Sequence, residues 1–138
     1  MDVVVLDNGA FSCKVGYAGK TPPKLVPNYA VQPKKEKKLF VADQIQDHIV
    51  DFSNLYYKRP HEKGCVINWE LENQIWARLF GKTVLNVTKP RETTLLLTEP
   101  MFCPYAIQKT TDEVVFEKFG FGGLHRSTGV MMARKCKY

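Results

Sequence analysis

The first nineteen residues constrain the fold of this chain most strongly. Residues 3–6 form an unbroken apolar run rich in β-branched side chains, which indicates a buried strand. Asp7-Asn8-Gly9 follows with three turn-favouring residues. The alternation of residues 13–17 then predicts a second strand. The sequence therefore predicts a tight hairpin with a polar turn at the end of a buried strand.

The polar residues of this turn suit phosphate chemistry. Backbone N–H groups in a tight turn can hold phosphate oxygens, and Lys14 adds a compensating positive charge. Asp7 can reach a hydrated cation through water. An ordinary hairpin with polar residues at its tip is the alternative interpretation, because short turn motifs also occur without a function.

Composition limits the class of protein. The chain has 138 residues, of which 44% are hydrophobic, and this suits one globular domain. The net charge of +6 permits contact with nucleic acid or an acidic protein but requires neither. The longest apolar runs are too short for a signal peptide or for the roughly 20 residues of a membrane span.

The cysteines and histidines fit no zinc-ligand spacing. We interpret the cysteines as reduced thiols of an intracellular protein, since none of them forms a closely spaced pair. These residues are Cys13, Cys65, Cys103 and Cys136, with His48, His61 and His125.

The middle of the chain has a weaker pattern. Residues 30–62 contain only short apolar segments and predict a small appendage rather than core. Within it, residues 33–38 form a basic run that is either a nucleic-acid patch or a solvated loop.

The pattern of a core returns after residue 62. Residues 65–67 predict a brief buried strand, and Asn68 is a good N-cap. A stripe of apolar side chains at helical spacing then predicts a helix that Gly81 ends. Glu70 and Glu72 place negative charge at the positive end of this helix.

The last third of the chain predicts one strand and two helices. Residues 93–98 form the strand, a second helix begins near Pro104 and ends at Gly120, and a third covers residues 128–135. The whole order predicts an α/β fold in which helices cover a mixed sheet.

Common catalytic and nucleotide-binding motifs are absent from the sequence. There is no Walker-type phosphate loop, and the glycine-rich residues 119–123 follow a predicted helix rather than a strand. Glu99 lies just past a buried strand, where active-site acids often occur, but it has no partner in the pattern.

Four motifs, in the right order, resemble the actin superfamily. They are residues 5–9 with 13–19, residues 59–64 with 66–69, residues 95–100, and residues 116–119. The first resembles the phosphate-binding hairpin of that family, and the second resembles the return from its outer subdomain into a long helix. The resemblance implies an incomplete actin-like (ribonuclease H-like) fold, the first part of the N-terminal lobe. Its core would be residues 1–29 and 63–138, with a shortened outer subdomain of residues 30–62.

Three further segments resemble a nuclear actin-related subfamily, whose members belong to remodelling complexes that exchange a histone variant. They are residues 40–45, 55–57 and 79–82. This resemblance implies a non-catalytic scaffold in the nucleus, with the cytoplasm as the other possible location. The implied partners are subunits of such a complex and nucleosomal DNA, the latter touched through Lys34, Lys35, Lys37 and Lys38.

The resemblance also implies a nucleotide site that is weakened here. The matching hairpin residues are Asp7, Asn8, Gly9, Ala10 and Lys14. Ala10 stands where the family has a phosphate-contacting hydroxyl, and Phe11 stands where it has a glycine. ATP or ADP with Mg²⁺ is therefore expected at most weakly in the full-length protein, and not from this chain alone, because the other half of the family's site would follow Tyr138.

Two other departures concern hydrolysis and assembly. Gly129 stands where the family's water-positioning glutamine is expected, and glycine can neither orient water nor relay a proton. Residues 34–38 are all charged where conventional actin has a longer, largely uncharged loop, so neither ATP hydrolysis nor filament formation is expected. An ATP-binding cytoskeletal protein and a basic nucleic-acid module remain the alternatives.

Overall fold

A mixed five-stranded sheet forms the larger part of the protein. The computed structural model describes residues 1–131. The strand order is β10-β9-β1-β2-β3, and the strands are β1 (Asp2–Asn8), β2 (Ser12–Tyr17), β3 (Lys24–Pro27), β9 (Thr93–Glu99) and β10 (Gly123–Thr128). β1 runs antiparallel to β2 and parallel to β9, and β10 runs parallel to β9. The predicted α/β fold with a mixed sheet is confirmed.

The predicted hairpin at the N-terminus is also confirmed. β1 and β2 pair from Val4–Tyr17 to Asn8–Cys13. Val4, Leu6 and Val15 are fully buried, as the apolar run and its alternation require.

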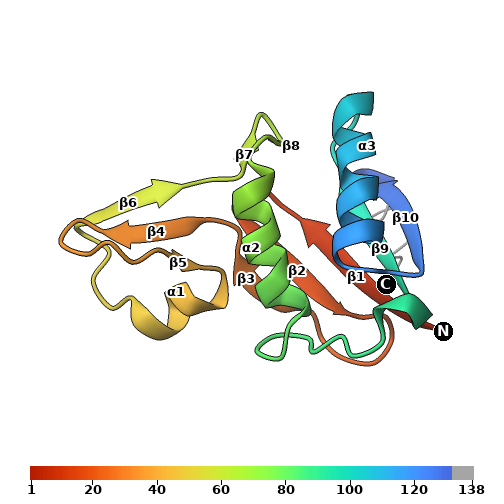
Figure 1. Ribbon diagram of the computed structural model, residues 1–138, viewed down its shortest axis with the longest axis horizontal. Coiled ribbons are helices and arrows are strands. Elements are labelled where there is room, and N and C mark those ends of the chain that lie inside the picture. Colours follow the sequence, from red (N-terminus) through yellow and green to blue (C-terminus); the bar gives the residue numbers. More distant parts are fainter. Residues whose placement is uncertain (132–138) are drawn as a thin grey trace.

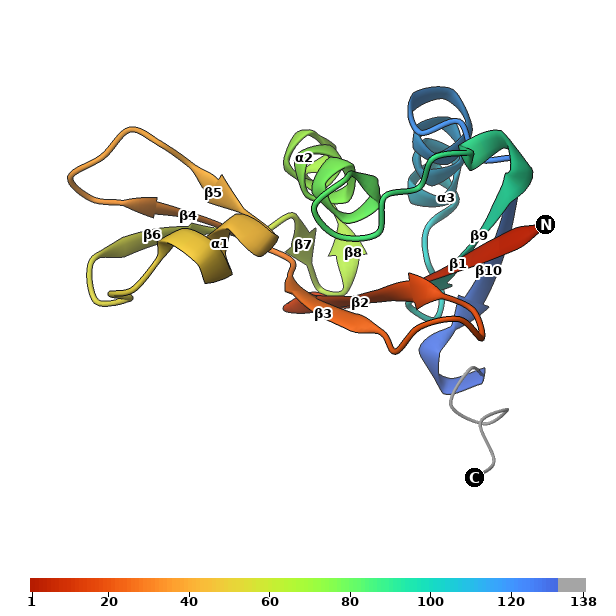
Figure 2. The same ribbon diagram turned by 90° about the horizontal axis from the view of Figure 1, so that it is seen from below.

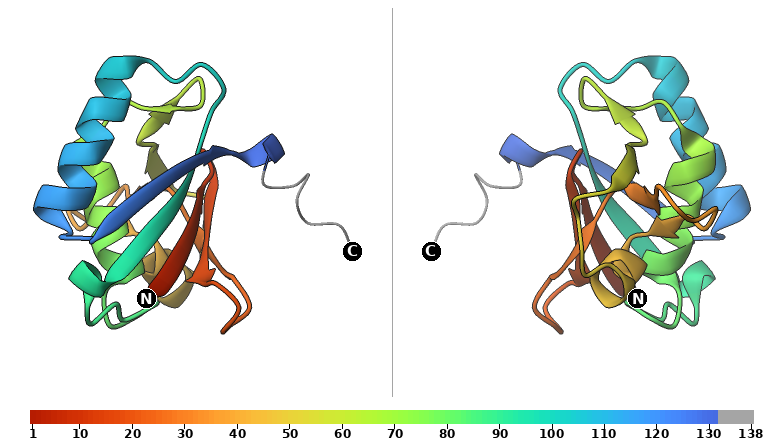
Figure 3. Two further views of the ribbon diagram at one scale, coloured as in Figure 1. Left: turned by 90° about the vertical axis from the view of Figure 1, so that its right-hand side faces the viewer. Right: turned by 90° about the vertical axis from the view of Figure 1, so that its left-hand side faces the viewer.

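Two helices cover the same face of this sheet (Figures 1 and 2). They are α2 (Trp69–Phe80) and α3 (Tyr105–Glu113), and Figure 3 shows both on one side of the strands. The Asn68 side chain caps α2 by accepting a hydrogen bond from the Leu71 N–H at 3.1 Å. The predicted bounds of α2 are confirmed, because capping and the buried stripe agree.

The second predicted helix changes form before its end. α3 continues into a π-helical turn (Val114–Lys118), and Gly120 follows at φ +70°. One face of this segment is buried, at Thr111, Val114 and Val115. Glycine suits the end of this segment because a positive φ carries little steric cost without a Cβ.

A smaller sheet extends away from the larger one (Figure 1). Its strand order is β5-β4-β6, with β4 (Ala30–Pro33), β5 (Phe40–Val41) and β6 (Leu55–Lys58). The short helix α1 (Asp43–His48) completes its own apolar cluster of Val31, Phe40 and Ile45. A hairpin of β7 (His61–Glu62) and β8 (Cys65–Val66) then leads into α2.

The end of the chain departs from the sequence-based expectation. Residues 123–128 form β10, a strand that the sequence did not predict, and Thr128 is its last residue rather than the first of a helix. Helical structure begins only at residue 129, and residues 132–135 of the predicted helix lie outside the described part of the chain. The strand has no apolar run because it lies at the edge of the sheet, where pairing with β9 decides its conformation.

Candidate functional site

The predicted site lies where three parallel strands end. β1, β9 and β10 run in the same direction, with Leu6 opposite Leu97 and Glu99 opposite Thr128. Asn8, Glu99 and Thr128 therefore reach the same edge of the sheet. In open α/β sheets, ligands bind outside the carboxyl ends of the strands, at the point where the strand order reverses.

Asp7 and Lys14 are brought together across the hairpin. Asp7 Oδ2 lies 3.3 Å from Lys14 Nζ, while Asp7 Oδ1 accepts a hydrogen bond from the Thr98 hydroxyl at 2.8 Å. Their side chains are 43% and 56% exposed, respectively. Thr98 thus orients the carboxylate, and both charges remain open to solvent and to a ligand.

The turn between the strands is narrow and depends on Gly9. A Cβ on Gly9 would lie 2.5 Å from the carbonyl oxygen of Ser12, closer than real Cβ contacts allow. The strand pairing ends at Asn8 and Cys13, so the backbone N–H groups of Gly9, Ala10 and Phe11 lie beyond the ladder. Ala10 and Phe11 are exposed, and the Phe11 ring packs beside Tyr29 with 5.4 Å between centroids. The turn supplies N–H donors but no hydroxyl at Ala10.

Asn8 points its side chain away from solvent and into the protein. Its Oδ1 lies within hydrogen-bonding distance of three donors: Asn28 Nδ2 at 3.2 Å, Cys13 Sγ at 3.3 Å and Trp76 Nε1 at 3.4 Å. Its backbone N–H donates to the Thr98 hydroxyl at 3.1 Å. The asparagine therefore anchors the turn to α2 and β9, and its amide is committed to the protein interior.

Asn28 and Glu72 form the buried centre of this network. Both are fully buried. Asn28 Nδ2 donates to the Gly9 carbonyl at 2.8 Å and lies 3.5 Å from Glu72 Oε1, which also accepts from Trp76 Nε1 at 2.9 Å. His61 Nδ1 lies 3.4 Å from the same Asn28 nitrogen. We call Asn8, Asn28, His61, Glu72 and Trp76 the polar cluster.

Burial changes the ionisation of two members of the polar cluster. It raises the pKa of Glu72 to about 7, although hydrogen bonds from Asn8, Asn28 and Trp76 oppose the shift. Burial also lowers the pKa of His61. Burial thus favours the neutral form of both residues, as expected for groups withdrawn from water without a charged partner.

The sequence pattern did not predict the polar cluster, and Glu72 was expected only to complement the helix dipole. Glu72 is in phase with the buried stripe, three and four residues before Ile75 and Trp76. A carboxylate on an apolar helix face was therefore a usable signal. Asn28 had no comparable signal, because its partners come from β1, β7 and α2.

Glu99, the lone acid noted in the sequence, is engaged in an ion pair. Its Oε1 lies 2.8 Å from Arg126 Nε, and Arg126 also pairs with Asp112. Burial raises the pKa of Glu99, against the effect of Arg126. These contacts tie β9, β10 and α3 together and account for the carboxylate structurally.

Gly129 directly follows β10 at the same edge of the sheet. A Cβ added to it would meet nothing within 4 Å. The position therefore has open space around it and presents no side chain to that space.

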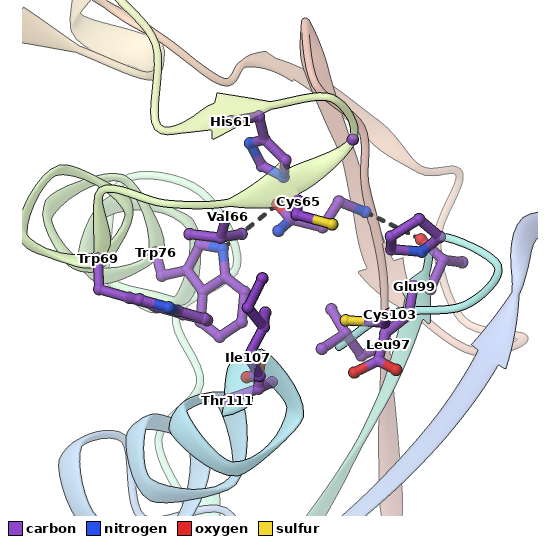
Figure 4. Close-up of a pocket in the computed structure, with 14 residues that line it drawn as sticks. His61, Cys65, Val66, Trp69, Trp76, Leu97, Glu99, Cys103, Ile107 and Thr111 are labelled. Carbon is purple, nitrogen blue, oxygen red and sulfur yellow. Dashed lines mark hydrogen bonds between the residues drawn. The ribbon is translucent and has the colours of Figure 1, made fainter. Parts of the chain in front are cut away.

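A small cavity lies beside the polar cluster (Figure 4). It has a volume of about 30 Å³, with His61, Cys65 and Trp76 on one part of its wall and Cys103 and Ile107 on another. That volume accommodates about one water molecule. It is too small for a nucleotide.

Residues 1–131 offer neither a metal-binding cluster nor a membrane-spanning helix. Within this part of the chain, no group of three or more His, Cys, Asp or Glu side chains could hold a metal ion. None of its helices is long and apolar enough to cross a membrane.

Comparison with known proteins decides the family. A sequence model of the actin family matches residues 1–134. The chain belongs to the actin family. This agrees with the mixed sheet and with the incomplete lobe that the resemblance predicted.

Several curated relatives are actin-related proteins. The chain is 42% identical over 125 residues to "Actin-like protein ARP6" of Cryptococcus neoformans, covering 90% of this chain and 25% of the relative. It is 43% identical over 123 residues to "Actin-related protein 6" of Oryza sativa subsp. indica, covering 88% and 28%. It is 35% identical over 132 residues to "Actin-related protein 6" of Drosophila melanogaster, covering 95% and 33%. The actin-family chain thus spans only a quarter to a third of these relatives.

Proposed function

We propose that this actin-family chain contributes to a non-catalytic scaffold that acts by docking to partner subunits. The implied setting is a nuclear chromatin-remodelling complex that exchanges a histone variant, which the resemblance to the actin-related subfamily suggests. The scaffold uses the framework of the phosphate hairpin for its shape rather than for chemistry.

One contrast carries this proposal. The buried side chains that support the hairpin are present, whereas the side chains that would contact phosphate or water are not. Five buried or half-buried side chains of the polar cluster brace the turn from behind. The exposed positions lack reactive groups, because Ala10 has no hydroxyl and Gly129 presents no side chain. A buried polar network is costly to build. A fold that retains this network but lacks the exposed side chains that would contact phosphate or water is suited to a structural role.

Nucleotide binding is compatible with this scaffold but weak. Asp7, Lys14 and the N–H groups of the turn would hold phosphate oxygens, and Asp7 would reach Mg²⁺ through water. The phosphate charge of a bound nucleotide would link this lobe to the second lobe of a full actin fold. Hydrolysis would still need a side chain that positions the attacking water. One missing charge-assisted hydrogen bond at Ala10 removes about 1.5–3 kcal/mol from phosphate binding.

Affinity purification of the full-length protein from nuclear extract tests the proposal. The expected result is co-purification with the subunits of one remodelling complex, together with single-turnover ATP hydrolysis no faster than the uncatalysed background. Recovery of the protein free of any such complex, or hydrolysis at the rate of conventional actin, would contradict it.

Direct contact with nucleosomal DNA is a second proposal, and the loop between β4 and β5 favours it. Lys34, Lys35, Lys37 and Lys38 are all exposed there. Lys34 Nζ lies 5.5 Å from the centre of the Tyr56 ring and Lys38 Nζ lies 5.1 Å from that of Phe40, so the loop is held against the small sheet. Replacing all four lysines with glutamine should weaken DNA binding. It should also make the slope of log affinity against log salt concentration shallower, by an amount that corresponds to up to about four neutralised phosphates. An unchanged salt slope would count against this contact.

A further inference from the structure

We propose that Cys65 and Cys103 are a redox modification site that closes to an intramolecular disulfide. The bond would join the β7–β8 hairpin to the loop that follows β9. This inference does not depend on the proposed function, because it concerns only thiol chemistry within the described fold.

The geometry brings the two thiols to one place from distant parts of the sequence. Both side chains line the same small cavity, and both sulfur atoms lie toward it in Figure 4. The Cys65 thiol is near enough to Cys103 to contribute to the raised pKa of the Cys103 thiol. Both cysteines are free and only partly buried, whereas Cys13 is fully buried.

The two segments that carry the thiols also lie close together. A Cβ added to Gly64 would lie 3.7 Å from Pro100 Cβ, so the turn of the β7–β8 hairpin lies close to the start of the loop that carries Cys103. Closing the disulfide therefore needs side-chain rotation and a small local adjustment rather than a rearrangement of the fold.

The oxidant is a low-molecular-weight disulfide such as oxidised glutathione. The Cys65 thiolate attacks one sulfur of this disulfide, which forms a mixed disulfide and releases one glutathione thiolate. The Cys103 thiolate then attacks the Cys65 sulfur and releases the second glutathione. Two protein thiols lose two electrons and two protons, and two glutathione molecules gain them.

The environment sets this order of attack. Burial, with smaller effects of the Glu99 charge and the Cys65 thiol, raises the pKa of Cys103 to about 11. Cys103 is thus the poorer nucleophile at neutral pH and acts in the second, intramolecular step, where proximity compensates for its small thiolate fraction. The resting protein keeps both thiols reduced.

Closure would affect the polar cluster as well. His61 lies on β7 and faces Asn28, so a bond through Cys65 on the paired strand β8 would hold His61 in place. The small sheet returns to α2 through this same hairpin. The disulfide would therefore restrict movement of the small sheet relative to the large one.

Mass spectrometry of the folded protein tests the pair. The protein is equilibrated with oxidised and reduced glutathione, blocked with N-ethylmaleimide and digested with trypsin. The expected product is a linked species of peptides 64–78 and 92–109, lighter by two hydrogens than their sum. Cys65→Ser and Cys103→Ser should each abolish it, and Cys136→Ser should leave it unchanged. Circular dichroism verifies that each variant is folded.

Two results would overturn the proposal. One is full alkylation of Cys65 and Cys103 under conditions in which the denatured chain forms disulfides. The other is a random mixture of pairs that includes Cys13 or Cys136.

The order of attack has its own test. Glu99→Gln removes a charge that raises the pKa of Cys103 and should speed closure of the mixed disulfide, by about threefold for each unit of pKa lowered. Glu113→Gln makes the same charge change at an exposed position of α3 and should leave the rate unaltered. An unchanged rate in Glu99→Gln, in a protein with normal circular dichroism, would overturn Cys103 as the second attacker.

Discussion

The side-chain amide of Asn28 donates a hydrogen bond to the backbone carbonyl of Gly9 at 2.8 Å. Asn28 lies between β3 of the large sheet and β4 of the small one, and its backbone N–H also donates to the Phe11 carbonyl at 3.0 Å. One residue thus fixes both sides of the hairpin turn from the connection between the two sheets. The shape of the candidate site therefore depends on a residue that no ligand would touch.

Replacing Asn28 with alanine should destabilise the protein by about 2 kcal/mol, because the Gly9 carbonyl loses the Asn28 amide as donor and Glu72 loses one of its donors but keeps its hydrogen bond from Trp76. Urea unfolding followed by tryptophan fluorescence measures the change. Gln32→Ala removes an exposed amide that donates to the Glu36 carbonyl, and it should change stability by less than about 0.5 kcal/mol. Equal effects of the two substitutions would show that the Asn28 contacts are unimportant.

Glu72 should make stability depend on pH in the direction opposite to that of a salt-bridged acid. Its pKa is raised from 4.5 to about 7, so the folded state binds the proton more tightly than the unfolded state does. The contribution of Glu72 to the free energy of unfolding is fully present below pH 4.5. It falls by about 3 kcal/mol as the pH rises to about 7. Glu72 Oε2 has no hydrogen-bond partner among the described residues, which adds to the cost of ionising it there.

The variant Glu72→Gln should abolish this loss, because an amide stays neutral and retains an acceptor for Trp76 Nε1. It should be more stable than the parent protein at pH 7.5 and about equal to it at pH 4. Glu70→Gln, at an exposed position of the same helical turn, should leave the pH profile unchanged. A parent protein whose stability does not fall between pH 4.5 and 7 would argue against a neutral Glu72.

Asn28 and Glu72 show what the sequence could and could not predict. The apolar stripe and its Asn68 cap predicted α2 correctly because both signals are local. Glu72 could have been placed in the core by its phase within that stripe, yet its partners could not be named. Asn28 was unpredictable because its contacts join residues from four separate segments.

Other differences have a similar physical origin. β10 has a mostly polar sequence and forms through its parallel register with β9, which no local pattern encodes. β6 and β7 fell in a segment without a clear period, because β6 presents largely exposed side chains. The sequence placed Asp7 in the predicted turn and Lys14 on the second strand. In the structure β1 continues through Asn8, so Asp7 and Lys14 meet across the antiparallel pair as its register requires.

The ion pair between Asp43 and Arg78 should couple the small sheet to the core. Arg78 Nε lies 2.9 Å from Asp43 Oδ1 and Arg78 Nη2 lies 2.7 Å from Oδ2, so the contact between α1 and α2 is bidentate. The hydrogen bonds from Arg78, opposed by desolvation, lower the pKa of Asp43. A double-mutant cycle of Asp43→Asn and Arg78→Gln should give a coupling energy of about 1–2 kcal/mol, since the pair is partly buried.

Hydrogen exchange adds a local measurement of this pair. Asp43→Asn should speed exchange of amides in β4, β5 and β6 more than in β1 and β9, because it removes a link between two hydrophobic clusters. The exposed pair of Lys89 and Glu92, 3.3 Å apart, is the control and should couple by less than about 0.5 kcal/mol. Equal coupling in the two pairs would contradict the linking role of Asp43.

The missing hydroxyl at Ala10 can be restored without disturbing the fold. Ala10 is exposed on the turn, so Ala10→Ser should fold normally and add one donor toward a phosphate held by the neighbouring N–H groups. One charge-assisted hydrogen bond of about 1.5 kcal/mol corresponds to about a tenfold gain in affinity. Inorganic tripolyphosphate is a suitable probe, and Trp76 reports on binding because its Nε1 lies 3.4 Å from Asn8 Oδ1 at the base of the turn.

Fluorescence titration of the parent protein and of Ala10→Ser measures this gain. Ala18→Ser adds the same hydroxyl at an exposed position just past the far end of β2 and should leave the affinity unchanged. Lys14→Met should weaken tripolyphosphate binding in the parent protein and in Ala10→Ser, because it removes a positive charge beside the turn. If Ala10→Ser bound no more tightly than Ala18→Ser, the turn would not hold phosphate in the way the actin family implies, and the hairpin would be purely structural.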